Sequence, residues 1–260
     1  MLTSERQKKI TDILKEYKHI DVSSLSSILN VTEATIRKDL EKLENIGVLT
    51  RMHGGAILNN LDSTPSFSIN DPSAKEKSSI AKLASELISQ NEVVFLGLDP
   101  ICYYIARNLS SVSNLNVITN NVAIINELST YDNINLIALG GEIKRINEQA
   151  CMYGKISNSN LSNFHINKAF ISFDGVHDSI GYTLSDSSLL DMYKILNDRS
   201  EEVISVCDSS KYNNISMLNF CGITEIKKVI TSKDIPNLYK KIYFESGIQL
   251  FTTICSNVDG

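Results

Sequence analysis

The chain has 260 residues, of which 42% are hydrophobic and 21% charged, as in an ordinary globular protein. It has five scattered cysteines without a C-x-x-C pair, no apolar run of the roughly 18 residues that a membrane helix needs, and no hydrophobic export signal near its start. These features argue against a membrane protein and against a disulfide-stabilised secreted protein, so we expect a cytoplasmic protein with reduced cysteines.

The formal net charge of −5 argues by itself against nucleic-acid binding, but the charges are unevenly distributed. Residues 1–57 contain nine Lys or Arg and eight Asp or Glu, a net +1, whereas the remainder contains sixteen and twenty-two, a net −6. DNA binding by the first segment would therefore depend on where single charges lie and on presenting two copies.

Three short helices are predicted in residues 1–57, because apolar residues recur there at helical spacing. The predicted segments are 4–18, 23–29 and 33–46. The second helix is expected to begin at an N-cap, Asp21 or Ser23, and the third at Thr32. Gly47 is expected to end the third helix, and a short strand follows it at 48–52.

The third predicted helix has one apolar stripe, formed by Ile36, Leu40 and Leu43. The residues that face outward from its first half are Thr35, Arg37 and Lys38. A helix of this kind is most often an ordinary core helix with a solvated charged face, so periodicity alone does not establish DNA binding. A Thr/Arg/Lys surface followed by a small β-wing nevertheless suits the DNA major groove.

Residues 32–56 read T-E-A-T-I-R-K-D-L-E-K-L-E-N-I-G-V-L-T-R-M-H-G-G-A, which resembles the signature of the DeoR-type bacterial transcription regulators. The resemblance implies a winged helix-turn-helix domain over residues 1–57. The residues expected to bind DNA are Ser23, Ser24, Thr32, Thr35, Arg37, Lys38, Arg51 and His53. Arg37 can pair with guanine, Lys38 is expected on phosphate, and Arg51 and His53 of the wing on the DNA backbone. Ser23 and Ser24 can bind phosphate or can serve only as helix caps.

Residues 58–74 are rich in Asn, Ser, Asp and Pro and predict an interdomain linker. From residue 75 to 260 short aliphatic strands alternate with helices, which predicts an α/β domain with a mostly parallel, Rossmann-like sheet covered on both faces. The expected strands are 93–96, 116–119, 134–139, 168–173, 203–207 and 228–231. The expected helices are 76–89 before the first strand, 100–109 before the second and 122–128 before the third.

Ligands bind such sheets at the carboxyl ends of the strands, where this sequence has small and polar residues. The order of T-N-N, L-G-G-E, D-G-V and D-S-S-K also resembles the DeoR-type sensor domain, which is similar in fold to ribose-5-phosphate isomerase and usually binds a phosphorylated sugar. The resemblance, with Asp99 added from the first strand end, implies an effector pocket of Asp99, Thr119, Asn120, Gly140, Gly141, Asp174 and Lys211. The Gly and Asn residues can equally reflect turn chemistry, and Lys211 can be a solvated loop lysine.

One loop departs from the family, which typically has D-S-G-T-T after the first strand. Here the loop reads Gly97-Leu98-Asp99-Pro100-Ile101. Asp99 and Pro100 predict an N-cap and a first helical residue, so the Asp99 carboxylate would accept the N–H groups that otherwise bind a phosphate. A phosphate about 6 Å away would be repelled by roughly 2.8 kcal/mol per unit charge at an effective dielectric of 20. We therefore predict weak phosphosugar binding, with a differently charged effector or none.

The sequence thus predicts a DNA-binding transcription regulator, commonly a repressor in this family, of sugar or related carbon metabolism. Its expected partners are double-stranded operator DNA, a small-molecule effector and further copies of itself in a dimer or tetramer, with Tyr239, Tyr243 and Phe251 as candidates for the subunit contact. We expect no catalytic residue, cofactor, metal or membrane partner, and the four histidines lack metal-ligand spacing. Two alternatives remain: a sensor that only assembles subunits, and an isomerase-like enzyme with Asp174 or Asp208 as its base.

Overall fold

The computed structural model describes residues 3–17, 19–45, 49–52, 54–58, 73–147 and 149–253. The chain divides into two compact units, Met1–Thr64 and Pro65–Gly260. The predicted helix end at Gly47, the wing residue His53 and most of the predicted linker lie outside the described residues. None of the helices in the described ranges combines the length and the apolar character that a membrane crossing requires.

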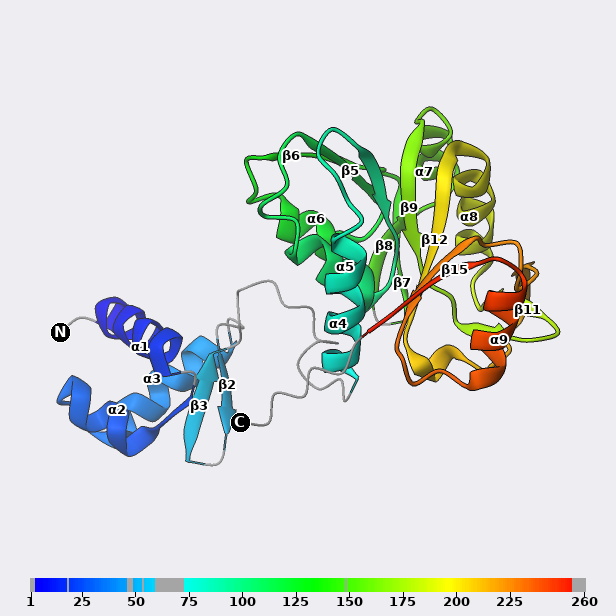
Figure 1. Cartoon of the computed structure of the whole chain (residues 1–260). Helices are drawn as coiled ribbons and strands as arrows, with labels where there is room; N and C mark the ends of the chain where they lie inside the picture. Colours follow the sequence, from blue (N-terminus) through cyan, green and yellow to red (C-terminus); the bar gives the residue numbers. More distant parts are fainter. Residues whose placement is uncertain are drawn as a thin grey trace. The chain divides into compact units, whose positions relative to one another are not determined.

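In its described residues the N-terminal unit has three helices (Figure 1) and a small antiparallel sheet in the order β1-β3-β2. Its elements are α1 (Thr3–Tyr17), β1 (His19–Asp21), α2 (Val22–Leu29), α3 (Glu33–Asn45), β2 (Leu49–Met52) and β3 (Gly55–Leu58). The predicted apolar stripe of α3 is buried with Leu14 and Leu25 from the other helices, which confirms the helix-turn-helix prediction. A Cβ atom on Gly55 would lie 2.5 Å from the carbonyl oxygen of Ile20, so glycine allows β3 to pair with β1.

The C-terminal unit is built on a seven-stranded parallel sheet in the order β15-β14-β12-β9-β4-β5-β6 (Figure 1). Its strands are β4 (Val93–Leu96), β5 (Leu115–Thr119), β6 (Ile134–Ala138), β9 (Ile166–Ile171), β12 (Ser200–Cys207), β14 (Lys228–Thr231) and β15 (Gln249–Thr252). The six predicted strands are confirmed, and β15 is an additional edge strand. Every neighbouring pair in this sheet is parallel, so the carboxyl ends of the strands lie along one edge.

Helices cover both faces of this sheet (Figure 1). One face carries α4 (Ala74–Ser85), α5 (Pro100–Arg107) and α6 (Val122–Leu128); the other carries α7 (Lys155–Leu161), α8 (Ser187–Arg199) and α9 (Asn237–Glu245). Tyr239 and Tyr243 of α9 are fully buried inside this second layer. The expectation that these two tyrosines contact another subunit is therefore wrong, because their rings already fill the core of their own unit, whereas Phe251 is half-buried.

Two small antiparallel assemblies were not predicted from the sequence. One is the hairpin of β7 (Glu142–Ile146) and β8 (Gln149–Tyr153). The other is a three-stranded sheet of β10 (Gly175–His177), β11 (Gly181–Leu184) and β13 (Leu218–Cys221). The hairpin follows β6 and the second assembly begins after β9, so both start from the carboxyl ends of strands of the parallel sheet.

Candidate nucleic-acid interface and ligand cavity

The turn between α2 and α3 is fixed by two local caps. Asn30 ends α2 with a φ of 51°, and its N–H group donates to the carbonyl oxygens of Ser26 and Ser27. The Thr32 hydroxyl accepts a long hydrogen bond of 3.4 Å from the N–H group of Thr35 and lies 2.9 Å from the Thr35 hydroxyl. The predicted N-cap at Thr32 is confirmed, and it sets where the first turn of α3 begins.

Arg37 and Lys38 are exposed on the first half of α3. The Arg37 side chain is 58% exposed, and its Nη2 lies 3.1 Å from Oε2 of Glu33 one turn earlier. An exposed pair of this kind contributes only about 0.3–0.5 kcal/mol, so Arg37 can leave Glu33 for a stronger acceptor at little cost. Thr35 is only half-exposed, and its hydroxyl already contacts Thr32.

Ser23 and Ser24 lie at the start of α2, and both contact the Asp21 carboxylate. That carboxylate accepts from the Ser23 hydroxyl at 2.5 Å, from the Ser24 N–H group at 2.7 Å and from the Ser24 hydroxyl at 2.9 Å. The hydrogen bond from Ser23, followed by those from Ser24, lowers the pKa of Asp21 to about 2. Because both hydroxyls already donate to an anion, the geometry favours the capping interpretation of these serines over phosphate binding.

Arg51 lies on β2, in the wing that β2 and β3 form. Its N–H group donates to Oε1 of Glu44 at 2.9 Å, and its Nη1 is 3.8 Å from Oε2 of the same residue. The Arg51 side chain is 42% exposed. Glu44 therefore holds the wing against the last turns of α3 and leaves the guanidinium accessible. The predicted wing contact at His53 lies outside the described residues.

A cavity of about 190 Å³ lies at the carboxyl ends of β4, β9 and β12. Its polar lining includes Lys77, Asp99, Asn147, Gln149, Asp174 and Lys211. Its apolar lining includes Leu98, Phe173, Leu184 and Leu189. Three of the seven predicted effector residues therefore meet here: Asp99, Asp174 and Lys211.

A larger hollow of about 440 Å³ lies at the opposite, amino ends of β12 and β14. Its lining includes Glu202 and Lys228, and the Lys228 ammonium already binds both carboxylate oxygens of Glu202 at 2.7 and 2.8 Å. Ligands of parallel sheets bind at the carboxyl ends of the strands, so the smaller cavity is the candidate site.

Asp99 caps α5 as the sequence predicts. Its Oδ1 accepts from the N–H group of Ile101 at 2.7 Å, and Pro100 occupies the first turn. The side chain is buried, with 7% of the residue exposed. Burial raises the pKa of Asp99 to about 6, although the charge of Lys211 and the Ile101 N–H group oppose that rise. The carboxylate thus occupies the helix N-terminus at which an anion would otherwise bind.

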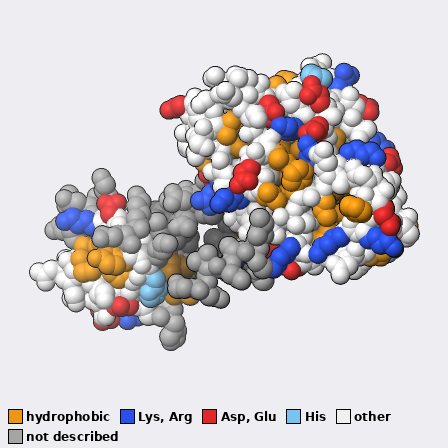
Figure 2. Space-filling view, in the orientation of Figure 1, with side chains coloured by type: hydrophobic (Ala, Val, Ile, Leu, Met, Phe, Trp, Pro, Cys, Tyr) orange, Lys and Arg blue, Asp and Glu red, His pale blue; other side chains and the backbone are white. Residues whose placement is uncertain are grey.

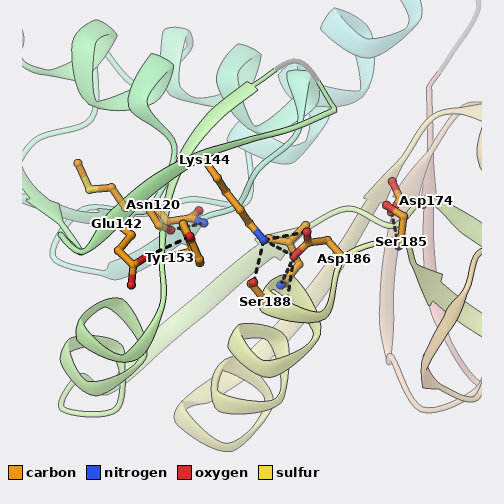
Figure 3. Close-up of polar contacts among 10 residues, drawn as sticks. Asn120, Glu142, Lys144, Tyr153, Asp174, Ser185, Asp186 and Ser188 are labelled. Atoms are coloured by element: carbon orange, nitrogen blue, oxygen red, sulfur yellow. Dashed lines mark hydrogen bonds and ion pairs between the residues drawn. The ribbon is translucent and has the colours of Figure 1, made fainter.

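Asp174 lines the cavity, contacts Ser185 (Figure 3) and is also hydrogen-bonded to the hairpin β7–β8. Its Oδ2 accepts from the N–H group and from the hydroxyl of Ser185, both at 2.7 Å. Its Oδ1 accepts from Nδ2 of Asn147 in the hairpin turn at 2.9 Å. Both oxygens of this carboxylate are therefore engaged by neighbouring loops.

Lys144 of β7 makes a second contact between the same hairpin and the rest of the unit. This residue was not among those predicted from the sequence. Its Nζ lies 2.8 and 2.9 Å from the two carboxylate oxygens of Asp186 and 2.8 Å from the Ser188 hydroxyl (Figure 3). It also lies 4.6 Å from the centre of the Tyr153 ring. Burial raises the pKa of Asp186, but the hydrogen bonds from Lys144 and Ser188 outweigh it and leave that pKa below its ordinary value. The only sequence signal was the cap pattern Asp186-Ser187-Ser188 at the start of α8.

The other four predicted effector residues do not line the cavity, which corrects their expected place. The Thr119 hydroxyl donates to the Leu96 carbonyl at 2.7 Å and so joins β5 to β4. Asn120 is buried and donates to the Met152 carbonyl at 3.3 Å. Gly140 and Gly141 have φ values of 72° and 110° and form the turn into the hairpin. These four residues therefore have roles in turn and strand geometry, and they do not contact a ligand in this cavity.

Comparison with known proteins gives matches over both units. The DeoR-like helix-turn-helix domain matches residues 6–61, and the DeoR C terminal sensor domain matches residues 73–233. The HTH-type transcriptional regulator YulB of Bacillus subtilis is 34% identical over 89% of this chain and 89% of its own. The lactose phosphotransferase system repressor of Staphylococcus epidermidis is 30% identical over 95% of this chain and 98% of its own.

A solved D-ribose-5-phosphate isomerase in complex with phospho-erythronic acid is 18% identical, with a TM-score of 0.38 over 52% of each chain, a likeness too distant to bear on function. The two domain matches and the two regulators, by contrast, extend over most of the sequence. The chain therefore belongs to the DeoR family of DNA-binding transcriptional regulators.

Proposed function

We propose that this DeoR-family regulator represses genes of sugar or related carbon metabolism and is controlled by a small metabolite in the carboxyl-end cavity. The observation that carries the proposal is that one chain has both a capped helix-turn-helix with exposed cations and a separate unit with a cavity lined by charged residues. The similarity to a lactose phosphotransferase system repressor supports the carbon-metabolism assignment. The proposed place of action is the cytoplasm, where operator DNA lies.

In this proposal residues 1–57 bind DNA through α3 and the wing. Arg37 reaches a base edge in the major groove, Lys38 and Arg51 bind phosphates, and Thr35 supports the turn that aims them. The larger unit is less suited to DNA, because Lys and Arg are interspersed with Asp and Glu on the face that Figure 2 shows. Residues 75–260 carry sensing and assembly.

The active species is proposed to be a dimer or tetramer. An N-terminal segment with a net charge of +1 gives little non-specific attraction to DNA, so one copy would bind an operator weakly. Two copies related by symmetry read two half-sites about 34–36 Å apart, or a multiple of that distance.

Sensing is proposed to act through the hairpin β7–β8. Asn147 and Lys144 tie this hairpin to Asp174 and Asp186, beside the cavity. A ligand hydroxyl that donates to Asp174 in place of Asn147 would break one of these two contacts of the hairpin. The ligand then favours one arrangement of the hairpin over another, which is the differential interaction that regulation requires.

The test is to map the bound sites across the genome and then to titrate purified protein onto the mapped fragments. We expect sites next to genes of carbon metabolism, and release of the DNA by a metabolite of that pathway in fluorescence anisotropy. The double variant Arg37→Ala/Lys38→Ala is the control that should lose the fragments. Sites next to unrelated genes would refute the carbon-metabolism assignment, whereas the absence of any ligand effect would favour the alternative in which the larger unit only assembles subunits.

A further inference from the structure

The Asp99 carboxylate belongs to a residue that lines the cavity, and one of its two oxygens accepts a hydrogen bond within the fold. Oδ1 accepts from the Ile101 N–H group at 2.7 Å, whereas Oδ2 has no hydrogen-bond partner among the residues that the structure describes. Asp99 nevertheless lines the cavity and is 7% exposed. A carboxylate oxygen in a largely buried residue is a strong acceptor that is stabilised when a donor binds it. The cavity therefore favours a ligand that donates a hydrogen bond at this point.

The charges that line the cavity are balanced. Lys77 and Lys211 contribute two positive charges, and Asp99 and Asp174 contribute two negative charges. Lys77 also lies 3.8 Å from Asp208, which is fully buried. A phosphate monoester with a charge of about −1.5 to −2 would find no surplus positive charge here. An ammonium ligand would add a third cation beside the two lysines, so the balance favours a neutral ligand.

The N-terminus of α5 does not provide the positive potential that the cavity lining lacks for a phosphate. Asp99 is itself the N-cap and accepts from Ile101, and Pro100 at the start of the helix has no N–H group. A phosphate that came to this helix end would have to lie next to the Asp99 carboxylate. The repulsion between two like charges at close range in a buried site weakens such binding tenfold to a hundredfold.

The rest of the lining suits a molecule with both hydroxyl groups and C–H surface. Asn147 and Ser172 provide amide and hydroxyl groups, whereas Phe173 and Leu189 provide apolar surface. The cavity volume of about 190 Å³ is below the roughly 300–1,000 Å³ of sites for drug-sized ligands, so it suits a small metabolite.

We infer, as a refinement that rests on the proposed sensing function, that the cavity binds a neutral polyhydroxylated ligand, an unphosphorylated sugar or sugar alcohol. One ligand hydroxyl donates to Oδ2 of Asp99, and the same carboxylate excludes the phosphorylated forms. Asp99 is thus the residue that determines specificity between a sugar and its phosphate ester.

The experiment is calorimetry on the full chain with matched pairs: ribose and ribose 5-phosphate, glucose and glucose 6-phosphate, sorbitol and sorbitol 6-phosphate, together with inorganic phosphate. The proteins are the wild type, Asp99→Asn and, as a control for charge alone, Asp191→Asn, whose side chain is exposed on α8. Asparagine keeps an oxygen for the Ile101 cap while removing the charge. If circular dichroism shows that Asp99→Asn does not fold, Asp99→Ser is used in its place, because serine also caps helices.

We expect the wild type to bind at least one neutral compound and to bind the phosphate of that compound at least tenfold more weakly. Asp99→Asn should bind the phosphates about tenfold to a hundredfold more tightly and the neutral compound more weakly, and Asp191→Asn should match the wild type. The inference is overturned if a phosphate binds the wild type as tightly as its parent sugar, if Asp99→Asn leaves the phosphate affinities unchanged, or if no neutral compound binds.

Regulation is measured separately, as operator affinity in the presence of the bound compound. A neutral compound that binds the cavity without changing operator affinity would leave the ligand class intact and refute the proposed sensing function. A compound of the other class that releases the operator would leave the sensing function intact and refute the ligand class.

Discussion

The Nε atom of Arg6 in α1 lies 2.5 Å from Oδ2 of Asp39 in α3, and Asp39 is only 2% exposed. Gln7 adds a weaker contact at 3.4 Å to the other carboxylate oxygen. Arg37 and Lys38 immediately precede Asp39, and successive residues of a helix are rotated by about 100°. The buried pair therefore fixes the rotation of α3 about its axis, and with it the direction in which Arg37 and Lys38 point.

Asp39→Ala is expected to destabilise the N-terminal unit by up to about 3–5 kcal/mol, because it removes the buried carboxylate that the part-buried Arg6 guanidinium binds. Operator affinity should fall with it, although Asp39 is not itself exposed to DNA. The measurement is thermal unfolding together with fluorescence anisotropy on an operator fragment. The matched control is Arg6→Leu/Asp39→Leu, which removes both charges and should recover most of the stability. Equal losses in the single and double variants would contradict this account.

Arg37→Ala and Lys38→Ala are expected to weaken DNA binding in different ways. Loss of Arg37 should cost roughly 1–3 kcal/mol on the operator and relax the base preference at one position. Loss of Lys38 should weaken all sequences alike and reduce the slope of log K against log salt by about one. Anisotropy titrations at several salt concentrations separate the two outcomes, with Lys9→Ala on the exposed side of α1 as a control for charge alone. Operator binding that neither variant changes would remove α3 from the DNA interface.

The helix-turn-helix was predictable because its signals are local. The caps at Asp21 and Thr32 and the stripe from Ile36 to Leu43 act within one or two helical turns, and the structure has each of them. The pair of Arg6 and Asp39 was not predictable in this way, since its members are 33 residues apart and periodicity assigns a charged residue to the solvent. Only the packing of α1 on α3 buries them together.

The parallel sheet was also predictable from the sequence, whereas only some of the residues that line the cavity were. Aliphatic runs identified the buried strands, and the strand-end rule located the correct edge of the sheet. That rule gives no side-chain directions, and Thr119 turned out to bind the backbone of β4 instead of facing the cavity. The hairpin was missed because its strands are short and half-exposed, as Lys144 and Ile143 illustrate.

Lys144→Met is expected to loosen the hairpin β7–β8 while leaving the parallel sheet intact. The variant removes hydrogen bonds from the ammonium group to Asp186 and Ser188, and the side chains of Lys144 and Asp186 are only about one quarter exposed. A charged hydrogen bond of this kind contributes about 1.5–3 kcal/mol, less where water screens it. Hydrogen exchange should accelerate in 142–153 and stay unchanged in β9 and β12. Lys155→Met, an exposed neighbour on α7, is the control, and unchanged exchange in the hairpin would show that Lys144 does not hold it.

Asp99→Asn is expected to stabilise the protein at neutral pH. Burial raises the pKa of Asp99 from an ordinary 3.8 to about 6, while Lys211 and the Ile101 N–H group act in the opposite direction and Asp208 adds to the rise. A carboxyl group with a raised pKa in the folded state favours folding only while it is protonated. The folded wild type is therefore progressively destabilised, relative to the asparagine variant, as the pH rises from about 4 to about 6.

The pKa difference corresponds to about 3 kcal/mol above pH 7 and to about half of that at pH 5. Asparagine keeps the cap on Ile101 and carries no charge at either pH. The melting temperature of Asp99→Asn should therefore exceed that of the wild type by several degrees at pH 7.5, and by clearly less at pH 5. Asp191→Asn, which removes an exposed carboxylate, should show no such change with pH. A stabilisation that is the same at both values, or a less stable variant at pH 7.5, would mean that the buried Asp99 carboxylate is fully compensated by its surroundings.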